Sequence, residues 1–234
     1  MNSIEQNLAN WKASLFQSIP VAGLMARSPV AYKWKAPHRS WMLREAVFWR
    51  LHDLMSQSYA LYTQGHMLGA RILLRSGFER VAMLIYLNHL TNQVLEGNLR
   101  FHDFGDKTSR LLLGSRNKTT SQTAINIITI FEKCENCYPS LMGVYEILSE
   151  SAHPNHEGLC GGYSWVDQAN HQTYFENRWV KLYGDRHLSA MELCMEIFHH
   201  EYHDVWPHLL EQFEGWIEAN DASLEATKSD TAQV

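Results

Sequence analysis

The chain has 234 residues, of which 45% are hydrophobic, so it is long enough to bury one sizeable core. Its formal net charge of −5 argues against the broad basic face that sequence-independent binding to a nucleic-acid duplex requires. No apolar run approaches the ~20 residues of a membrane span, and the first residues lack the basic and apolar regions of a signal peptide. We therefore expect a cytoplasmic protein, without membrane association, whose four cysteines are reduced.

The first 39 residues are predicted to form a short amphipathic helix over residues 4–19 and then an irregular arm over residues 21–39. The arm interleaves basic and aromatic side chains, namely Arg27, Tyr32, Lys33, Trp34, Lys35 and Arg39. Such a mixture can hold single-stranded nucleic acid by stacking and charge, or it can pack a loop onto a domain. We favour packing because this interleaving is common in loops.

The strongest structural signal is a pair of long helices over residues 40–62 and 66–90, with apolar residues at helical spacing. Ser40 is the expected N-cap of the first helix, and Gly65 separates it from the second. A connection this short predicts an antiparallel helical hairpin.

Two shorter helices are expected next, over residues 121–133 and 141–152. Ser140 is the expected N-cap of the second, because the preceding Pro139 cannot lie inside a helix. Pro154 should end it just after His153.

The last part of the chain changes pattern near residues 159–183, where two short strands flank a polar turn and predict a β-hairpin. A final long helix is expected over residues 189–219, kinked or split by Pro207, and a disordered tail over residues 221–234. The predicted fold is mainly α. It is an antiparallel helical bundle over residues 40–220, with a small β-hairpin insertion between the last two long helices.

One candidate site lies on the second long helix, where Arg71, Arg75 and Glu79 follow one another at intervals of four residues and so share a face. Buried charges are costly unless they are paired. The three side chains therefore form either an internal ladder of ion pairs or a pocket in which the arginines bind a phosphate or another anion.

A second candidate site lies on the helix over residues 141–152, which places Glu146, Ser149, Glu150 and His153 on one side. A histidine at a helix C-terminus, with a carboxylate one turn before it, is suited to proton transfer. The alternative is that His153 only caps the helix.

Metal binding is the third alternative. His199 and His203 are four residues apart and could clamp an ion, joined by His153, His156 and Glu157 in a metal-dependent hydrolase. Cys134 and Cys137 form a single CxxC pair, and no second pair follows at zinc-site spacing. We expect no metal and no cofactor.

Two segments carry a family resemblance. ARILLRSGFE on the central helix, and YEILSESAHPN about sixty residues later, resemble the HEPN-like helical proteins. More narrowly, they are similar to an uncharacterised prokaryotic family with an Arg and a Glu on the central helix and a Y-x-x-L-S-x-x-x-H signature on a later one. The corresponding residues here are Arg71, Glu79, Tyr145, Leu148, Ser149 and His153.

The resemblance implies a cytoplasmic helical bundle that forms a homodimer. Many HEPN proteins are metal-independent ribonucleases of toxin–antitoxin and phage-defence systems, in which an Arg and a His four to six residues apart on one helix act on RNA. This chain departs from that pattern, because no Arg lies within residues 141–152 and Glu146 stands where the catalytic Arg is expected.

Two main functional hypotheses follow. In the first, the protein is an RNA-directed effector in which His153 is the general acid and base, Glu150 orients it, and Arg71 and Arg75 bind phosphate. Structural or orienting roles are then expected for Glu79, Tyr145 and Ser149. In the second, the protein is a non-catalytic HEPN-like module that binds a partner protein or a small ligand.

Overall fold

The structure is a computed structural model that describes residues 3–228. The described residues are mainly helical, with one small antiparallel sheet, so the predicted fold class is confirmed. They group into two compact units. Unit 1 holds the residues up to 15, 48–82 and 131–198, and unit 2 holds 16–47, 83–130 and the residues from 199 onward.

The two longest helices are α4 (Lys35–Thr63) and α5 (Met67–Leu95), and each contributes residues to both units. The turn between them depends on Gly65, whose positive φ of 79° suits glycine. There the His66 amide donates to the Leu61 carbonyl at 2.8 Å, as in a helix C-cap. The predicted hairpin is confirmed.

The sequence pattern predicted that Ser40 caps the start of the first long helix, and this prediction is wrong. Ser40 lies inside α4, where its hydroxyl donates to the Ala36 carbonyl at 2.9 Å. A serine within a helix can satisfy its hydroxyl in this way, so it is not by itself a start signal.

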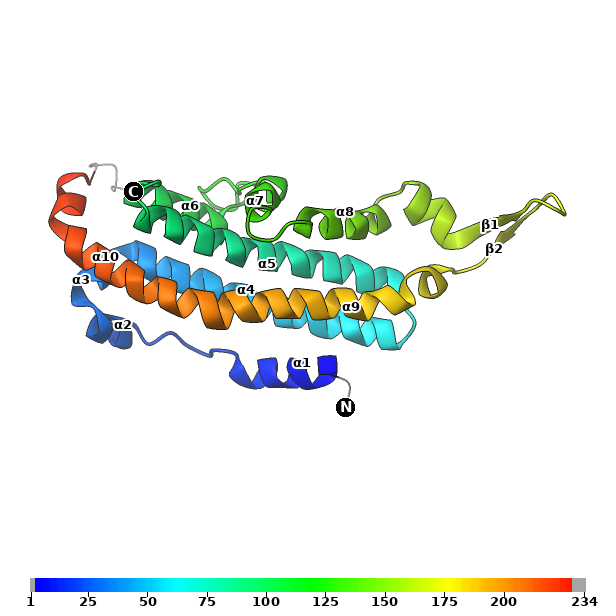
Figure 1. The fold of residues 1–234 in the computed structure, drawn as a ribbon, viewed down its shortest axis with the longest axis horizontal. Coiled ribbons are helices and arrows are strands. Elements are labelled where there is room, and N and C mark those ends of the chain that lie inside the picture. The colour runs from blue at the N-terminus through cyan, green and yellow to red at the C-terminus, as the bar shows by residue number, and fades with distance from the viewer. Residues whose placement is uncertain (1–2, 229–234) are drawn as a thin grey trace. The chain divides into compact units, whose positions relative to one another are not determined.

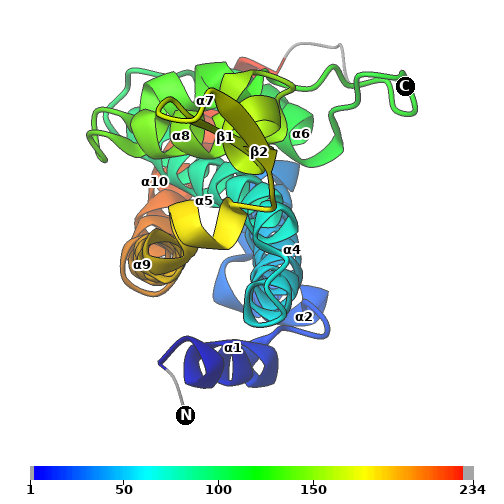
Figure 2. The same ribbon diagram turned by 90° about the vertical axis from the view of Figure 1, so that its right-hand side faces the viewer.

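Unit 1 contains further elements besides its parts of α4 and α5 (Figure 1 and Figure 2). In chain order they are α1 (Ser3–Ser14), the second half of α7 (Ile127–Cys134), α8 (Leu141–Ala152), the π-helical turn η1 (His156–Gly161), β1 (Ser164–Asp167), β2 (Gln172–Phe175) and α9 (Trp179–His199).

Aromatic rings attach α1 to the core of unit 1. Trp11 meets Phe48 and Phe198 in edge-to-face contacts, with ring centroids 5.7 Å and 5.0 Å apart. Gly77 on α5 permits close packing nearby, because a Cβ there would lie 3.3 Å from the Met55 sulfur and 3.8 Å from the Cys194 sulfur. Side chains of α4 and α9 therefore both approach the backbone of α5.

The start of α8 differs from the prediction in its cap. Ser140 has a left-handed backbone, with φ of 78°, and its side chain makes no capping hydrogen bond. The Glu135 carboxylate accepts instead from the amides of Ser140 and Met142, at 3.3 Å and 2.7 Å. A carboxylate suits this position, because the exposed N–H groups of a helix start favour negative charge. The end of α8 at Ala152, before Pro154, is as predicted.

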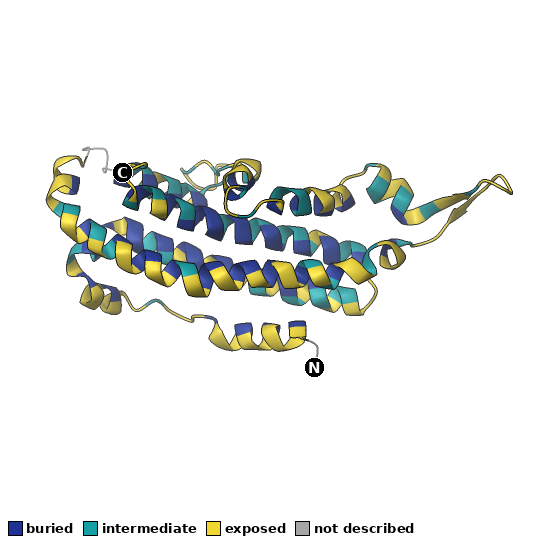
Figure 3. Ribbon diagram, viewed as in Figure 1, coloured by how far each residue is buried: buried dark blue, intermediate teal, exposed yellow. Residues whose placement is uncertain are grey.

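The predicted β-hairpin is confirmed within its expected range. Strands β1 and β2 pair antiparallel, with Trp165 opposite Tyr174 and Val166 opposite Thr173. The Trp165 and Tyr174 rings stack at 4.6 Å. Figure 3 shows that both strands are exposed over most of their length.

Unit 2 contains α2 (Val21–Arg27), α3 (Pro29–Tyr32), α6 (Phe101–Leu113), the π-helical segment η2 (His200–Val205) and α10 (Trp206–Ala226), besides its parts of α4 and α5. The expectation of an irregular arm over residues 21–39 is wrong, because α2, α3 and the start of α4 lie there. Ser28 caps α3 by accepting from the Ala31 amide at 3.0 Å, and Pro29 occupies the first helical position.

Helix α10 holds this arm in place by charge. Arg27 pairs with Glu214 at 2.6 Å, and Lys33 pairs with Asp221 at 2.6 Å. Two of the arm's basic residues thus meet acidic partners within the chain, which agrees with the packing interpretation. The prediction that the tail is disordered from Asp221 is wrong up to Ala226, where α10 ends, and residues 229–234 lie outside the described part.

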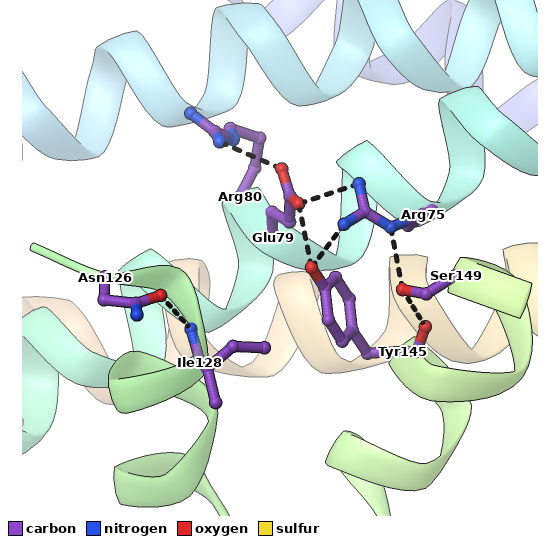
Figure 4. Close-up of polar contacts among 7 residues, drawn as sticks. All are labelled: Arg75, Glu79, Arg80, Asn126, Ile128, Tyr145 and Ser149. Atoms are coloured by element: carbon purple, nitrogen blue, oxygen red, sulfur yellow. Dashed lines mark hydrogen bonds and ion pairs between the residues drawn. The ribbon is translucent and has the colours of Figure 1, made fainter. Parts of the chain in front are cut away.

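Helix boundaries were least well predicted between residues 98 and 133. Helix α6 was missed, and α7 begins at Ile127 rather than at residue 121. Asn126 caps α7 by accepting from the Ile128 amide at 3.1 Å (Figure 4). Short amphipathic helices with glycines inside or beside them give a weak periodic signal.

The final helical segment begins at Trp179, ten residues before the predicted start, and is split as expected near Pro207. Segment η2 has π-helical bonding, in which the Trp206 amide donates to the Glu201 carbonyl. The next bond of this pattern would run from residue 207 to the Tyr202 carbonyl. Pro207 has no N–H and cannot make it. Arg44 of α4 donates to that carbonyl at 3.0 Å, so a buried guanidinium substitutes for the missing amide.

Arg44 also pairs with the buried Glu45 carboxylate, whose other oxygen accepts from the Tyr202 hydroxyl at 2.7 Å. Replacing Arg44 with Met should lower the free energy of unfolding by about 3–5 kcal/mol, because it leaves a buried carboxylate without its cation. Denaturant unfolding measures the loss.

Two controls sharpen this test. Arg50→Met, at an exposed position of the same helix, should change stability little. In a Pro207→Ala background the cost of Arg44→Met should be smaller, because residue 207 then has an N–H. If Arg44→Met lowers the free energy of unfolding equally in both backgrounds, the Arg44 guanidinium does not replace the missing N–H of residue 207.

Candidate functional site

The candidate site residues on α5 and α8 are brought together by antiparallel packing. Arg75 of α5 donates from Nε to the Ser149 hydroxyl at 2.8 Å and from Nη2 to the Tyr145 hydroxyl (Figure 4). Its Nη1 lies 3.1 Å from the Glu79 carboxylate, four residues along the same helix. The Arg75 guanidinium therefore has three partners within the protein.

Tyr145 links the two charges of this pair. Its hydroxyl donates to the Glu79 carboxylate at 3.3 Å while accepting from Arg75. Burial raises the pKa of Tyr145, against the opposing effect of the Arg75 charge. The predicted ladder from Arg75 to Glu79 is thus present, and α8 supplies its connecting hydroxyls.

Arg71 forms a separate group of contacts one turn earlier on α5. Its Nε donates to the Ser151 hydroxyl at 2.7 Å, and its Nη2 donates to the Ile147 carbonyl at 3.2 Å. The guanidinium carbon lies 3.9 Å from the centre of the Tyr183 ring, and Nη2 lies 3.8 Å from the Glu157 carboxylate.

Electrostatics around Arg71 follow from its depth, since the residue is only 3% exposed. Burial lowers the pKa of its guanidinium, and Tyr183 and Glu157 act in the opposite direction. Burial, together with a hydrogen bond to the Glu157 carboxylate, raises the pKa of Tyr183 to about 12. At neutral pH the group therefore consists of one cation, one carboxylate and two neutral hydroxyls, those of Tyr183 and Ser151.

The structure does not join His153 to this network. His153 is exposed at the C-cap of α8, and within residues 3–228 its ring has no hydrogen-bond or ion-pair partner. Glu150, expected to orient it, instead accepts a hydrogen bond from the Asn155 amide. The polar residues expected on one side of α8 therefore do not form one site. Ser149 packs against α5, whereas Glu146 and Glu150 are exposed.

Sequence reasoning missed Ser151, Glu157 and Tyr183 as partners of Arg71. Ser151 and Glu157 lie close to His153 in the sequence. Helical spacing did not identify Ser151, because a residue two positions after Ser149 is not expected on the same helix face. Tyr183 comes from α9, more than a hundred residues after Arg71. A pattern within one helix cannot indicate such a contact.

Metal ligands do not gather in the part of the chain that the structure describes. No group of three His, Cys, Asp or Glu side chains there could hold a metal ion. His199 and His203 have ring centroids 4.6 Å apart on an exposed face. Of the CxxC cysteines, Cys134 is buried with its thiol donating to the Ala82 carbonyl, and Cys137 is exposed.

A buried polar pair of unit 1 was not predicted. His187 of α9 is 1% exposed, and its Nε2 lies 3.2 Å from the hydroxyl of Ser58, which also lies 2.8 Å from the Ala70 carbonyl. Tyr62 stacks on the His187 ring at 5.4 Å. Burial, and secondly the positive charge of Arg71, lowers the pKa of His187 to about 4, so the ring is neutral in the folded protein.

Comparison with known proteins adds no relative, since no family model, no curated protein and no solved structure matches this chain. Among the described helices, none combines the length and the apolar character needed to cross a membrane. Functional inference therefore depends on the contacts of the chain itself.

Tyr145→Phe should lower the free energy of unfolding by about 1.5 kcal/mol, a typical value for a hydrogen bond to a charged group. The reason is that Arg75 and Glu79 lose the hydroxyl that links them. Denaturant unfolding measures this change. Tyr174→Phe, which removes an exposed hydroxyl from the β-hairpin, is the matched control and should have little effect. Equal losses in the two variants would refute the linking role.

His187 should make the protein less stable in acid. The unfolded chain binds a proton near the ordinary pKa of about 6.5, whereas the folded state resists protonation until about pH 4. The stabilisation is complete above pH 6.5 and is lost as the pH falls toward 4, by about 3 kcal/mol in total. Unfolding curves of wild type and His187→Phe between pH 7 and 4 isolate this contribution. A difference in the free energy of unfolding between the two proteins that stays constant from pH 7 to pH 4 would contradict this contribution.

Proposed function

We propose that the protein is a non-catalytic binding module with an HEPN-like helical core, which recognises a partner protein through residues 147–182. The observation that carries the proposal is the distribution of exposed apolar side chains. Half of the large exposed hydrophobic residues in the described part of the chain fall in this segment, namely Ile147, Leu159, Tyr163, Trp165, Val166, Tyr174, Phe175, Val180 and Leu182. Such a concentration is typical of a protein–protein interaction site.

The β-hairpin is the most exposed part of this segment. Because side chains alternate along a strand, Trp165 and Tyr174 share one face, and Val166 and Phe175 lie on the other. Phe175 is 82% exposed and Val166 is 62% exposed. A hairpin of two short strands is marginally stable in water, so a partner that covers an apolar face would also stabilise the strands.

Charge favours an apolar protein surface over RNA as the partner. Residues 147–182 contain four acidic and two basic side chains, so they lack the cationic character that phosphate binding requires. The paired side chains of Arg71 and Arg75 also support a structural role for these arginines.

The core supports the HEPN-like part of the proposal in one respect. The two segments that carry the resemblance contact each other. Motif residue Glu79 accepts from motif residue Tyr145, and Arg75 of the first segment donates to motif residue Ser149. In a non-catalytic module these contacts hold α8 against α5. The proposed partner is then bound by elements that α8 positions.

A cleavage assay tests the non-catalytic part. Purified protein should not degrade total cellular RNA in the presence of EDTA, and His153→Ala should behave like wild type. Cleavage by wild type that His153→Ala abolishes, and that His171→Ala retains, would overturn the proposal in favour of an RNA-directed enzyme.

A variant of the hairpin tests the binding part. Val166→Ser combined with Phe175→Ser should weaken partner binding at least about tenfold, because central apolar side chains dominate interface energies. The partner is captured with wild-type protein and purified, and its affinity for both chains is measured by calorimetry. Sedimentation shows whether the partner is a second copy of the chain.

Ile128→Ser is the matched control, since Ile128 is 40% exposed outside the segment. It should bind like wild type. Unchanged affinity of the hairpin variant, with an unchanged melting temperature, would show that the hairpin is not the binding surface.

A further inference from the structure

Three polar side chains of unit 1 lie around one carboxylate. The Ser151 hydroxyl donates to Glu157 Oε1 at 3.0 Å, and Arg71 Nη2 lies 3.8 Å from Oε1. Tyr183 covers the Arg71 guanidinium, and the Glu157 carboxylate helps to raise the pKa of its hydroxyl. The three side chains come from α8, α5 and α9, whereas Glu157 belongs to the short turn η1. Side chains from three separate helices thus lie around one carboxylate.

The donor side is built without help from Glu157. The Arg71 side chain is 4% exposed, and its partners Ser151 and the Ile147 carbonyl fix it against α8. Tyr183 covers the guanidinium face. These contacts hold the donors in position whether or not a carboxylate is bound.

Glu157 is the loosest member of the group. Its side chain is 29% exposed, and its separation from Arg71 is longer than the other polar distances around that guanidinium. The turn η1 has six residues, so few backbone hydrogen bonds hold it. Outward movement of η1 would uncover the donors while leaving the α5–α8 contacts intact.

Charge selects the kind of anion that these donors bind. They supply one positive charge, from Arg71, and two neutral hydroxyls. A carboxylate balances that charge, whereas a phosphate dianion carries twice the charge that these three donors supply. Two hydroxyls and a guanidinium also match the acceptor capacity of a carboxylate.

We propose that Arg71, Ser151 and Tyr183 form a carboxylate-binding site that Glu157 of the same chain occupies, so that an external carboxylate binds when η1 moves away. Glu157 is then an internal competitor that keeps the site closed to weak ligands. The external group is a small organic acid or the carboxylate of an acidic peptide. This site goes beyond the proposed function. Ser151 and Glu157 belong to residues 147–182, but the site uses none of the exposed apolar side chains of that segment.

Acetate binding to Glu157→Ala tests the proposal. The melting temperature of this variant should rise with acetate and saturate, while chloride at equal ionic strength has no such effect and phosphate has a weaker one. Wild-type protein should respond less at the same concentrations, because Glu157 competes. A peptide with a single Glu distinguishes the two sources, since tighter binding than acetate assigns the site to peptides and equal or weaker binding to small acids.

Two further variants in the Glu157→Ala background identify the donors. Adding Tyr183→Phe should weaken acetate binding about tenfold, the equivalent of one hydrogen bond. Adding Arg71→Met should abolish the response, and the tyrosine variant keeps the test decisive if the arginine variant does not fold.

Identical responses to acetate and chloride, or a full acetate response in the Tyr183→Phe variant, would overturn the proposal. A wild-type response equal to that of Glu157→Ala would show that Glu157 does not occupy the site. The Val166→Ser, Phe175→Ser hairpin variant should keep the wild-type acetate response. A negative acetate result therefore does not contradict the proposed partner binding by the hairpin. A negative result with the hairpin variant likewise does not contradict the carboxylate site.

Discussion

The cost of burying a guanidinium determines much of unit 1. Arg71 and Arg75 lie on the most apolar of the long helices, and a buried charge must be paired and hydrogen-bonded. Helix α8 meets this requirement with Tyr145, Ser149 and Ser151, in an antiparallel register in which the later residues of α8 meet the earlier arginine. The position of α8 on α5 then determines where η1 and the hairpin begin.

Unit 2 solves a related problem with a third arginine. Pro207 interrupts the backbone bonding of the last helical segment, and Arg44 donates to a carbonyl that the proline cannot reach. The same guanidinium pairs with Glu45 and lies 3.3 Å from the centre of the Tyr202 ring. In both units a buried arginine thus serves helix packing, and a motif rich in arginine is not by itself a sign of phosphate binding.

The contacts also separate the residues that hold the fold from those open to a ligand. The arginines that looked suited to phosphate are paired within the chain, and the histidine that looked suited to catalysis is exposed and apart from them. The accessible groups include apolar side chains around the hairpin and the part-exposed Glu157 carboxylate, which lies beside the buried Arg71. The two proposals rest on these features.

The sequence by itself determined the helical class, the α4–α5 hairpin, the end of α8 at Pro154, the strand pair and the interruption near Pro207. Each is local, because helical spacing, a glycine, a proline or alternating residues act within a few positions. It did not determine that α4 begins before Ser40, whose hydroxyl bonds to a carbonyl within the helix, or that the Glu135 carboxylate rather than the Ser140 side chain caps α8 at its predicted start. Tertiary structure alone decided that Arg71 meets Ser151, Glu157 and Tyr183. The reason is that pairing of buried charges depends on which side chains from distant parts of the chain are within reach, and spacing along one helix carries no information about them.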